Sequence, residues 1–424
     1  MPQAGLVDRR QALMGSATLF YEHPIEIVRG EGVYLYDEAG KQYIDMYNNV
    51  PCVGHANPRV VAAMQDQMGT LNVHSRYLHE GILNYAERLL SLHSSNMQSV
   101  VFACSGTEAS EVALMMARHA TGGKGIICTD ATYHGNSTEV SKMSARPVTD
   151  IHFRSIPYPQ TFRPLNLAMS GDSLTQLYLD KVQAAIDSFA ADNIPFAGLF
   201  VCSIFANEGL PDIPPQFMAK AADLVHKAGG LVIADEVQAG FCRSGNWWGY
   251  QTSGFTPDIV TMGKPMGNGL PLSAVAASAD LVATFRKNTH YFNTFASSPL
   301  QAAVGTAVLE VIEDENLLVR SAELGDYLRK ELETMQQTSE TMGDVRGCGL
   351  FVGIEWVTDR ESNNVDRKGA MAVANKMKEK GFLLSNAGAM GNVIKVRPPL
   401  VFEKDHCDLF LTAFEEMLRE LNQT

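Results

Sequence analysis

The stretch LVIADEVQAGFCRSGNWWGYQTSGFTPDIVTMGKPMGNGL, Leu231–Leu270, contains two short apolar segments that each end on a reactive side chain. The first, Leu231–Ala234, is typical of a buried parallel strand and runs into Asp235. The second, Asp258–Met262, is followed after one glycine by Lys264. Open α/β sheets bind their ligands at the carboxyl ends of the strands. We therefore expect the acid and the lysine to face one site.

An acid and a lysine placed in this way have a definite chemical use. A pyridoxal phosphate enzyme needs a lysine that forms a Schiff base with the cofactor, and a carboxylate that keeps the pyridine nitrogen protonated. Taken alone, Lys264 is more simply explained as a surface lysine, and Asp235 as an acid at a strand end. Their joint context favours the cofactor site.

The order A-D-E-V-Q-x-G-F-x-R-x-G, then P-D-I-V-T-x-G-K and a glycine-rich turn, resembles the class III aminotransferases. The resemblance implies an α/β fold of the pyridoxal phosphate fold type I, like that of aspartate aminotransferase, with a large and mainly parallel sheet. It also implies that Lys264 is the catalytic residue and carries pyridoxal 5′-phosphate. Asp235 would pair with the pyridine nitrogen, Val237 would pack under the ring, and Gln238 would bond the phenolic oxygen.

Composition excludes several other classes of protein. The chain has 424 residues, a net charge of −13 and no basic cluster longer than Arg9-Arg10, which argues against nucleic acid and anionic membranes as partners. Its seven cysteines show no paired metal-type spacing, so we expect reduced thiols and no metal site. No apolar run approaches the ~18 residues of a membrane span, and no export signal is present. A soluble, cytoplasmic protein is expected.

The rest of the chain fits a two-domain organisation. Residues 32–37 and 41–45 predict a β-hairpin like the one that opens class III aminotransferases. The pattern also predicts a long helix from Pro299 and a C-terminal region of mixed strands and helices. We expect residues 1–55 to form the N-terminal part of a small domain, 56–315 the large cofactor-binding domain, and 316–424 the C-terminal small domain.

The segment Ser105-Gly106-Thr107-Glu108 follows a predicted strand and begins a helix. Ser105 and Glu108 have the spacing of a capping box, while the free N–H groups of a helix N-terminus can bind phosphate. The resemblance implies that Ser105, Gly106 and Thr107 hold the cofactor phosphate. Cys104 stands where the family has asparagine, and we expect it to be a small buried hydrophobe.

Two further segments carry cofactor residues by resemblance. Tyr133-His134 precedes a glycine, as in a family motif whose aromatic ring stacks on the pyridine face, and both residues are predicted to bind the cofactor. Thr294 lies in a segment similar to one whose threonine reaches the cofactor phosphate of the neighbouring subunit. This implies a homodimer with shared active sites.

The predicted substrate site departs from the usual transaminase pattern. Class III enzymes usually place an arginine three residues before a Pro-Pro, and a glutamate elsewhere that neutralises it between two substrates. Here Lys395 takes the arginine's place, Arg397 lies on the same face by alternation, and residues 202–207 (CSIFAN) replace the acidic run. Arg76 lies in a segment that could be a plain polar loop but borders the substrate cavity in the family. Arg76 with Lys395 or Arg397 would suit a substrate with a dianionic end.

A narrower resemblance, over L-N-x-x-S-R-Y-L-H, Y-F-N-T-F and I-K-x-x-P-P, is to the phosphoethanolamine and phosphohydroxylysine phospho-lyases. It extends to bacterial lyases that release ammonia from 1-hydroxy-2-aminoethylphosphonate. We therefore predict a lyase acting on a small amine with a phosphate or phosphonate group, and the leaving group stays open. Residues 207–212 depart from the phospho-lyases, which moves the prediction towards the phosphonate. A class III omega-aminotransferase using pyruvate or 2-oxoglutarate is the alternative, and the predicted cofactor residues disfavour a cofactor-free binding protein.

Overall fold

A computed structural model describes residues 5–144 and 148–421 of the chain. Its largest sheet has seven strands in the order β4-β10-β9-β8-β7-β5-β6. These are β4 (Ser99–Ala103), β10 (Ser273–Ala277), β9 (Ile259–Met262), β8 (Leu231–Asp235), β7 (Phe196–Cys202), β5 (Gly125–Thr129) and β6 (Phe153–Ile156). All pairs from β9 to β6 are parallel, and β10 is antiparallel to both of its neighbours. The predicted α/β architecture with a mainly parallel sheet is confirmed.

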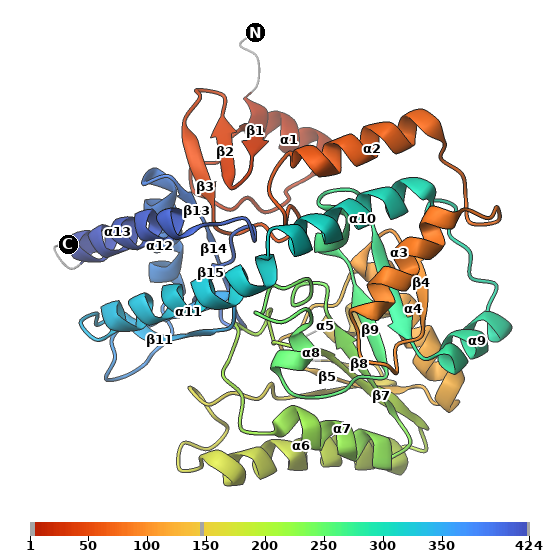
Figure 1. Cartoon of the computed structure of the whole chain (residues 1–424). Coiled ribbons are helices and arrows are strands. Elements are labelled where there is room, and N and C mark those ends of the chain that lie inside the picture. Colours follow the sequence, from red (N-terminus) through yellow and green to blue (C-terminus); the bar gives the residue numbers. More distant parts are fainter. Residues whose placement is uncertain (1–4, 145–147, 422–424) are drawn as a thin grey trace.

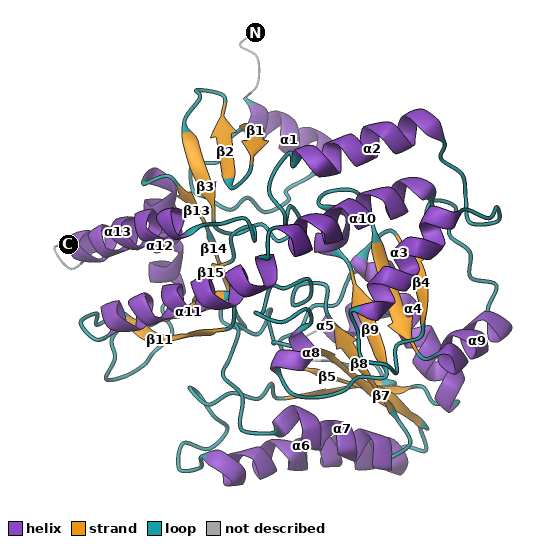
Figure 2. Ribbon diagram, in the orientation of Figure 1, coloured by secondary structure: helices purple, strands orange, loops and turns teal. Residues whose placement is uncertain are grey.

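Helices cover both faces of this sheet (Figures 1 and 2), which explains why its strands are nearly continuous apolar runs. Alternate residues of each strand join two different core clusters, as the two-residue period of a strand requires. Ile233 belongs to the cluster under α4 (Gly106–Thr121) and α9 (Ala279–Asn288). Its neighbours Val232 and Ala234 belong to the cluster that includes α6 (Gly171–Ala191) and α7 (Phe217–Lys227).

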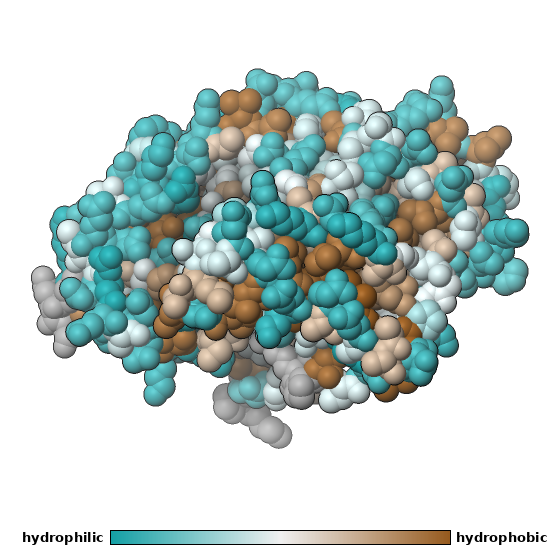
Figure 3. All heavy atoms as spheres, turned by 90° about the horizontal axis from the view of Figure 1, so that it is seen from below, coloured by the Kyte–Doolittle hydropathy of each residue, from teal (hydrophilic) through white to brown (hydrophobic). Residues whose placement is uncertain are grey.

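Helices α6 and α7 are amphipathic and form the lower edge of the molecule in Figure 1. α6 buries Leu174, Tyr178, Val182 and Phe189, which recur with helical spacing along one face. Seen from below, hydrophilic side chains stand along this surface with hydrophobic patches between them (Figure 3). No helix within residues 5–144 and 148–421 is long and apolar enough to cross a membrane.

Two four-stranded sheets lie beside the large one. The first, in the order β1-β2-β3-β13, contains the predicted hairpin and joins the two ends of the chain, because β3 pairs in parallel with β13. The second has the order β11-β12-β15-β14. The strands are β1 (Ile27–Glu31), β2 (Tyr34–Asp37), β3 (Gln42–Asp45), β11 (Met342–Gly347), β12 (Val352–Trp356), β13 (Phe382–Leu383), β14 (Ser385–Ala387) and β15 (Val393–Val396). The domain boundaries given above stay a prediction.

The remaining helices connect and cover these sheets. They are α1 (Leu6–Met14), α2 (Pro58–Thr70), α3 (Glu80–Ser91), α5 (Val140–Ser144), α8 (Gly249–Thr252), α10 (Pro299–Asp314), α11 (Leu317–Gln336), α12 (Arg367–Glu379), α13 (Lys404–Leu421) and the 3₁₀ turn η1 (Lys264–Gly267). The predicted long helix from Pro299 is confirmed, with proline at its first position and Ser298 as its cap.

One strand ends earlier than its sequence pattern indicates. The apolar run that predicts a strand over 199–205 leaves the sheet after Cys202. Phe205 and Leu210 have left-handed backbone conformations, with φ of 52° and 56°, which a continuing strand cannot accommodate. The residues after Cys202 therefore form a compact loop, residues 203–210, at the carboxyl end of β7.

Candidate active site

A cavity of about 220 Å³ lies at the carboxyl ends of the parallel strands. Its walls come from the start of α4, the loop after β5, the end of β7, the turn after β8, and η1 after β9. The lining residues are Gly106, Thr107, Tyr133, His134, Gly135, Cys202, Asp235, Val237, Gln238 and Lys264. Asp235 and Lys264 thus line one cavity, and most of the other predicted cofactor residues lie there with them.

Asp235 is held in one orientation by its neighbours. Its Oδ2 lies 2.6 Å from His134 Nδ1, and its Oδ1 accepts a hydrogen bond from the Val237 N–H at 2.9 Å. His134 is itself fixed, because its Nε2 lies 2.8 Å from Thr132 Oγ1. Asp235 as a residue is 5% exposed, so these contacts replace the water that its carboxylate would otherwise bind. His134 therefore orients the acid, a role that Thr132 supports and that the sequence pattern does not show.

The start of α4 is arranged to receive an anion. The Ser105 hydroxyl caps the helix by accepting the Glu108 N–H at 3.2 Å, while the N–H groups of Gly106 and Thr107 have no carbonyl of a preceding turn to bind. Glu108 does not complete the expected capping box, because its Oε2 accepts from the Cys104 N–H, one residue earlier. Cys104 packs against the main core as expected for a small hydrophobe, but it is only partly buried.

The residues present fit pyridoxal phosphate. A Cβ at Gly106 would lie 3.1 Å from the Val237 side chain, and one at Gly135 would lie 2.7 Å from Thr107 Oγ1, so glycine keeps the cavity open at both places. Around that opening stand a helix N-terminus for a phosphate and the Asp235 carboxylate for a pyridine nitrogen. The aliphatic side chain of Val237 and the amine of Lys264 also line the cavity.

Lys264 begins η1 and is largely buried. Burial lowers the pKa of its ammonium, and the nearby Asp235 carboxylate opposes that change. A lysine with a lowered pKa has more of its neutral amine at neutral pH. That form is the one that can act as a base.

A chain of hydrogen bonds leads from the cavity to Arg397, which directly follows the C-terminal strand β15. Gln238 Nε2 donates to Asn207 Oδ1 at 2.9 Å, and Asn207 Nδ2 donates to the Tyr133 carbonyl at 3.0 Å. Arg397 donates to Gln238 Oε1 at 2.6 Å and also to the Tyr47 carbonyl. Asn207 and Tyr47 are contacts that the motifs do not predict. The sequence signal at Asn207 is that residues 202–207 replace the acidic run of the family.

Lys395 lies on β15, Arg397 directly follows that strand, and both residues are buried. Burial lowers the pKa of Arg397 to about 10. Burial, and then the charge of Arg397, lower the pKa of Lys395 to about 7. Among the described residues, neither side chain forms a salt bridge. The structure thus places two unpaired buried cations beside Lys264.

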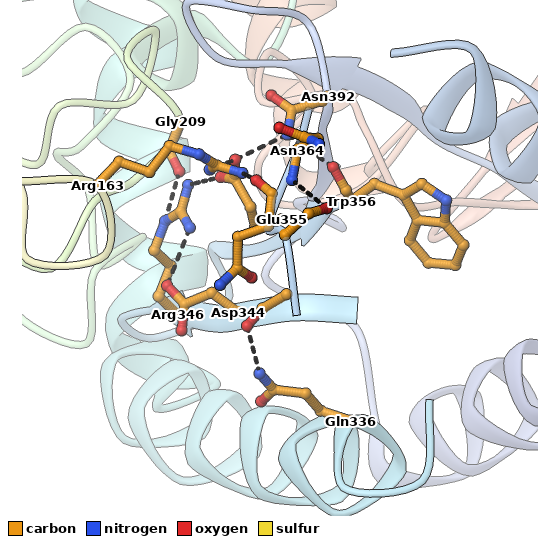
Figure 4. Close-up of polar contacts among 12 residues, drawn as sticks. Arg163, Gly209, Gln336, Asp344, Arg346, Glu355, Trp356, Asn364 and Asn392 are labelled. Atoms are coloured by element: carbon orange, nitrogen blue, oxygen red, sulfur yellow. Dashed lines mark hydrogen bonds and ion pairs between the residues drawn. The ribbon is translucent and has the colours of Figure 1, made fainter. Parts of the chain in front are cut away.

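Loop 203–210, which carries Asn207, is held in place by a largely buried ionic network (Figure 4). Arg346 donates from Nε to the Gly209 carbonyl at 3.0 Å and from NH2 to Glu355 Oε2 at 2.6 Å. Arg163 pairs with the other oxygen of Glu355, and Asn392 donates to that oxygen at 2.7 Å. The network therefore ties the loop to the β11–β12 pair.

Arg76 and Thr294 do not line the cavity of their own chain. Both are exposed, and their segments lie against each other, with the Arg76 guanidinium 4.2 Å from the centre of the Phe292 ring. Their predicted roles would need the cavity of a second subunit.

A family model described as "Aminotransferase class-III" matches residues 19–418. The chain belongs to the class III aminotransferase family. The "Alanine--glyoxylate aminotransferase 2-like" protein of Drosophila melanogaster is 36% identical, with 98% of this chain and 87% of that protein covered. The "Ethanolamine-phosphate phospho-lyase homolog 1" of Caenorhabditis elegans is 34% identical, with 99% and 94% covered.

Solved structures agree with this family assignment. A phospholyase from Arthrobacter in complex with phosphoethanolamine has a TM-score of 0.94 and 40% identity, covering 98% of this chain and 99% of that one. An omega transaminase from Pseudomonas jessenii, with 24% identity and a TM-score of 0.90, shares the fold. Fold type I is confirmed, and the cofactor of this class III enzyme is pyridoxal 5′-phosphate.

Proposed function

We propose that this class III enzyme is a lyase that performs β-elimination on a small amine carrying a phosphate or phosphonate group. With O-phosphoethanolamine the leaving group is phosphate, and one water is consumed when the eliminated product is hydrolysed, so that the products are acetaldehyde, ammonia and phosphate. With (R)-1-hydroxy-2-aminoethylphosphonate it is hydroxide, and the products are phosphonoacetaldehyde and ammonia. In both compounds the amine carbon lies next to the carbon that loses its substituent.

The observation that supports this proposal best is the pair of buried basic residues Lys395, on β15, and Arg397, directly after it. Lys395 and Arg397 are 4% and 5% exposed, and no carboxylate within residues 5–144 and 148–421 forms a salt bridge with either. Burial lowers the pKa of both groups, to about 7 for Lys395 and about 10 for Arg397, so an anionic ligand would stabilise their charged forms. A phosphate or phosphonate dianion would satisfy both groups.

The predicted site residues have complementary tasks. Gly106, Thr107, Asp235, Val237 and Gln238 would hold pyridoxal phosphate, whose ring when bound accepts electrons from the amine carbon. Lys264 Nζ takes the proton from that carbon, helped by its lowered pKa. Lys395 and Arg397 would hold the dianion and so fix the orientation of the bond that breaks.

Different observations favour the two substrates. A solved relative with 40% identity is described in complex with phosphoethanolamine, which supports the phosphate. The departure of residues 207–212 from the phospho-lyases supports the phosphonate. Measuring ammonia and inorganic phosphate released from each compound separates them: equal amounts of both from O-phosphoethanolamine, with nothing from the phosphonate, would select the phospho-lyase.

Transamination is the second candidate, because relatives at 36% and 31% identity are named as aminotransferases. A transaminase needs a device that accommodates a second substrate lacking the dianion. Arg397 is held here by Gln238 and Tyr47 rather than by an acid. Its charge therefore stays available to a dianion, which favours the lyase.

We also propose a homodimer with shared active sites. Tyr77 and Phe295 are 65% and 76% exposed and lie on the segments of Arg76 and Thr294. His74 links these segments, with its ring stacked on Tyr77 and edge-on to Phe292. Exposed apolar surface of this kind is typical of a protein–protein interface. In such a dimer, Arg76 and Thr294 of one subunit would lie next to the cavity of the other subunit.

A further inference from the structure

Asp45 is a fully buried acid at the end of β3, and the proposed mechanism does not use it. Its Oδ1 accepts hydrogen bonds from the backbone N–H groups of Tyr47 at 3.0 Å and Asn48 at 2.9 Å. Its Oδ2 accepts from the Asn48 side chain at 3.0 Å and lies 2.7 Å from His55 Nε2. The carboxylate therefore folds the turn that leaves the strand, residues 46–48.

His55 holds the Asp45 carboxylate in place. Backbone hydrogen bonds of 2.9 and 2.7 Å join His55 to Gly32 in both directions, so the imidazole is anchored to the strand region beside Asp45. Burial raises the pKa of Asp45, but the hydrogen bonds of His55 and of the turn outweigh burial and hold the pKa below its usual value. Asp45 is therefore ionised at neutral pH, and both of its oxygens can accept hydrogen bonds.

The same turn holds Arg397. The Met46 carbonyl accepts the backbone N–H of Arg397 at 2.7 Å. The Tyr47 carbonyl accepts from Arg397 Nε at 2.9 Å and from its NH2 at 2.7 Å. In the described part of the chain, the remaining hydrogen bond that Arg397 donates goes from NH1 to Gln238. The turn thus fixes both the backbone and the side chain of Arg397.

Two planar peptide groups connect Asp45 to Arg397. The Met46 carbonyl and the Tyr47 N–H belong to one group, and the Tyr47 carbonyl and the Asn48 N–H belong to the next. Asp45 binds the N–H of each group, and Arg397 binds the carbonyl of each. Because a peptide group is planar and rigid, an oxygen that fixes its N–H also fixes the direction of its carbonyl. The carboxylate and the guanidinium are therefore coupled through these two groups.

We propose that Asp45 is a positioning residue that aims the Arg397 guanidinium at the anionic end of the substrate. The inference rests on the proposed function, which assigns that end to Lys395 and Arg397. A guanidinium is planar and its donors have fixed directions, so a turn that moves also moves the N–H groups left for the substrate. The Met46 N–H donates to the Leu383 carbonyl at 2.8 Å, but this contact restrains the peptide group before the two that Arg397 binds. Asp45 is therefore the side chain that orients both of them.

The test measures the affinity of the holoenzyme for methylphosphonate, an unreactive phosphonate, by calorimetric titration at one pH. The proteins are the wild type, Asp45→Ala, Asp45→Asn, Arg397→Met and the double variant that combines Asp45→Ala with Arg397→Met. Asp37→Asn is the matched control, because Asp37 Oδ1 also accepts two backbone N–H groups of a turn in the same sheet, at 3.0 and 2.9 Å. Within the described residues, that turn accepts no hydrogen bond from Arg397. The pyridoxal phosphate retained after dialysis is measured on each protein.

Removing the carboxylate should weaken the binding of methylphosphonate through Arg397 alone. Asp45→Ala should lower the affinity by roughly 10- to 100-fold, since a misplacement of about 1 Å can cost about 100-fold. Asp45→Asn keeps an oxygen for the two N–H groups but turns a donor towards the Asn48 side chain, so it should lose less. In the Arg397→Met background, Asp45→Ala should change the affinity by less than about twofold, the usual error of such a cycle. Cofactor retention in every variant, and the affinity of Asp37→Asn, should match the wild type.

Unchanged affinity in Asp45→Ala would overturn the proposal. Equal losses from Asp45→Ala with and without Arg397→Met would also overturn it, because the acid would then act on the fold and not through Arg397. An equal loss in Asp37→Asn would have the same meaning. If Asp45→Ala does not fold, unchanged affinity in Asp45→Asn decides against the positioning role.

Turnover measured on the same proteins separates this inference from the proposed function. A wild type that eliminates from neither phospho-compound, while Asp45→Ala still weakens methylphosphonate binding only when Arg397 is present, would contradict the lyase and support the positioning role. A wild type that eliminates, with an affinity for methylphosphonate that does not depend on Asp45, would contradict the positioning role and support the lyase.

Discussion

At the scale of single residues, Lys264 and Asp235 carry most of the predicted chemistry. We expect Lys264→Ala to abolish turnover, because no other amine stands at the carboxyl end of β9 in the described cavity. The variant should still bind pyridoxal phosphate through Asp235 and the start of α4. The two measurements are the turnover rate and the amount of cofactor retained after dialysis. Lys404→Ala, at an exposed position of α13, is the control. Full activity in Lys264→Ala would contradict the assignment of Lys264 as the catalytic residue of a pyridoxal phosphate enzyme.

The residues that could be predicted from the sequence share one property. Asp235, Val237, Gln238 and Lys264 belong to one continuous motif, so their order alone indicates a site. Arg397 reaches the Tyr47 carbonyl across 350 positions of sequence, and no local pattern reports such a contact. Glu208 is a similar case, because its hydrogen-bond partner Thr129 lies on β5, 79 positions earlier in the sequence, and only the folded chain brings the two together.

At the scale of elements, strand and helix types follow from periodicity, whereas their ends depend on local backbone conformation. The apolar run after Leu199 continues past Cys202, yet β7 ends there because the following loop needs left-handed conformations. That loop, and with it Asn207 and Glu208, is positioned by the network of Arg346 and Glu355 (Figure 4).

We expect Glu355→Gln to destabilise the fold by ~3 kcal/mol, because it leaves the buried Arg346 with Asp344 as its single acidic partner. Burial raises the pKa of Glu355, but Arg346 and Arg163 outweigh that effect and hold it below its usual value. The contribution is therefore complete above about pH 4.3, the ordinary glutamate pKa, and is lost as the pH falls through the lower folded value.

Urea unfolding at pH 7 and at pH 4 measures this contribution. The wild type should lose stability between the two values, and Glu355→Gln should lose less. Glu415→Gln is the control, because it breaks an exposed pair with Arg419 and should leave the midpoint unchanged. Equal acid sensitivity in the wild type and in Glu355→Gln would contradict the role of the network.

At the scale of the whole molecule, five predicted site residues do not line the described cavity of one chain: Ser105, Lys395, Arg397, Arg76 and Thr294. Arg76 and Thr294 lie on an exposed surface with Leu78, which is 99% exposed. We expect Leu78→Asp to shift the protein from dimer to monomer, since it places a charge in the proposed interface. Sedimentation velocity over a range of concentrations measures this. Leu167→Asp, at a residue that is 86% exposed in the segment before α6, should remain dimeric. A wild type that is monomeric and fully active would rule the shared site out.

The central claim is that the buried basic residues Lys395 and Arg397 make this class III enzyme a lyase. The most direct measurement offers the holoenzyme O-phosphoethanolamine or (R)-1-hydroxy-2-aminoethylphosphonate, with and without pyruvate or 2-oxoglutarate, and follows ammonia and the amino acid formed from the keto acid. We predict ammonia from at least one compound, at a rate that the keto acid does not change, and little alanine or glutamate. Rapid alanine or glutamate formation, with no ammonia from either compound, would contradict the account and return the enzyme to the transaminases.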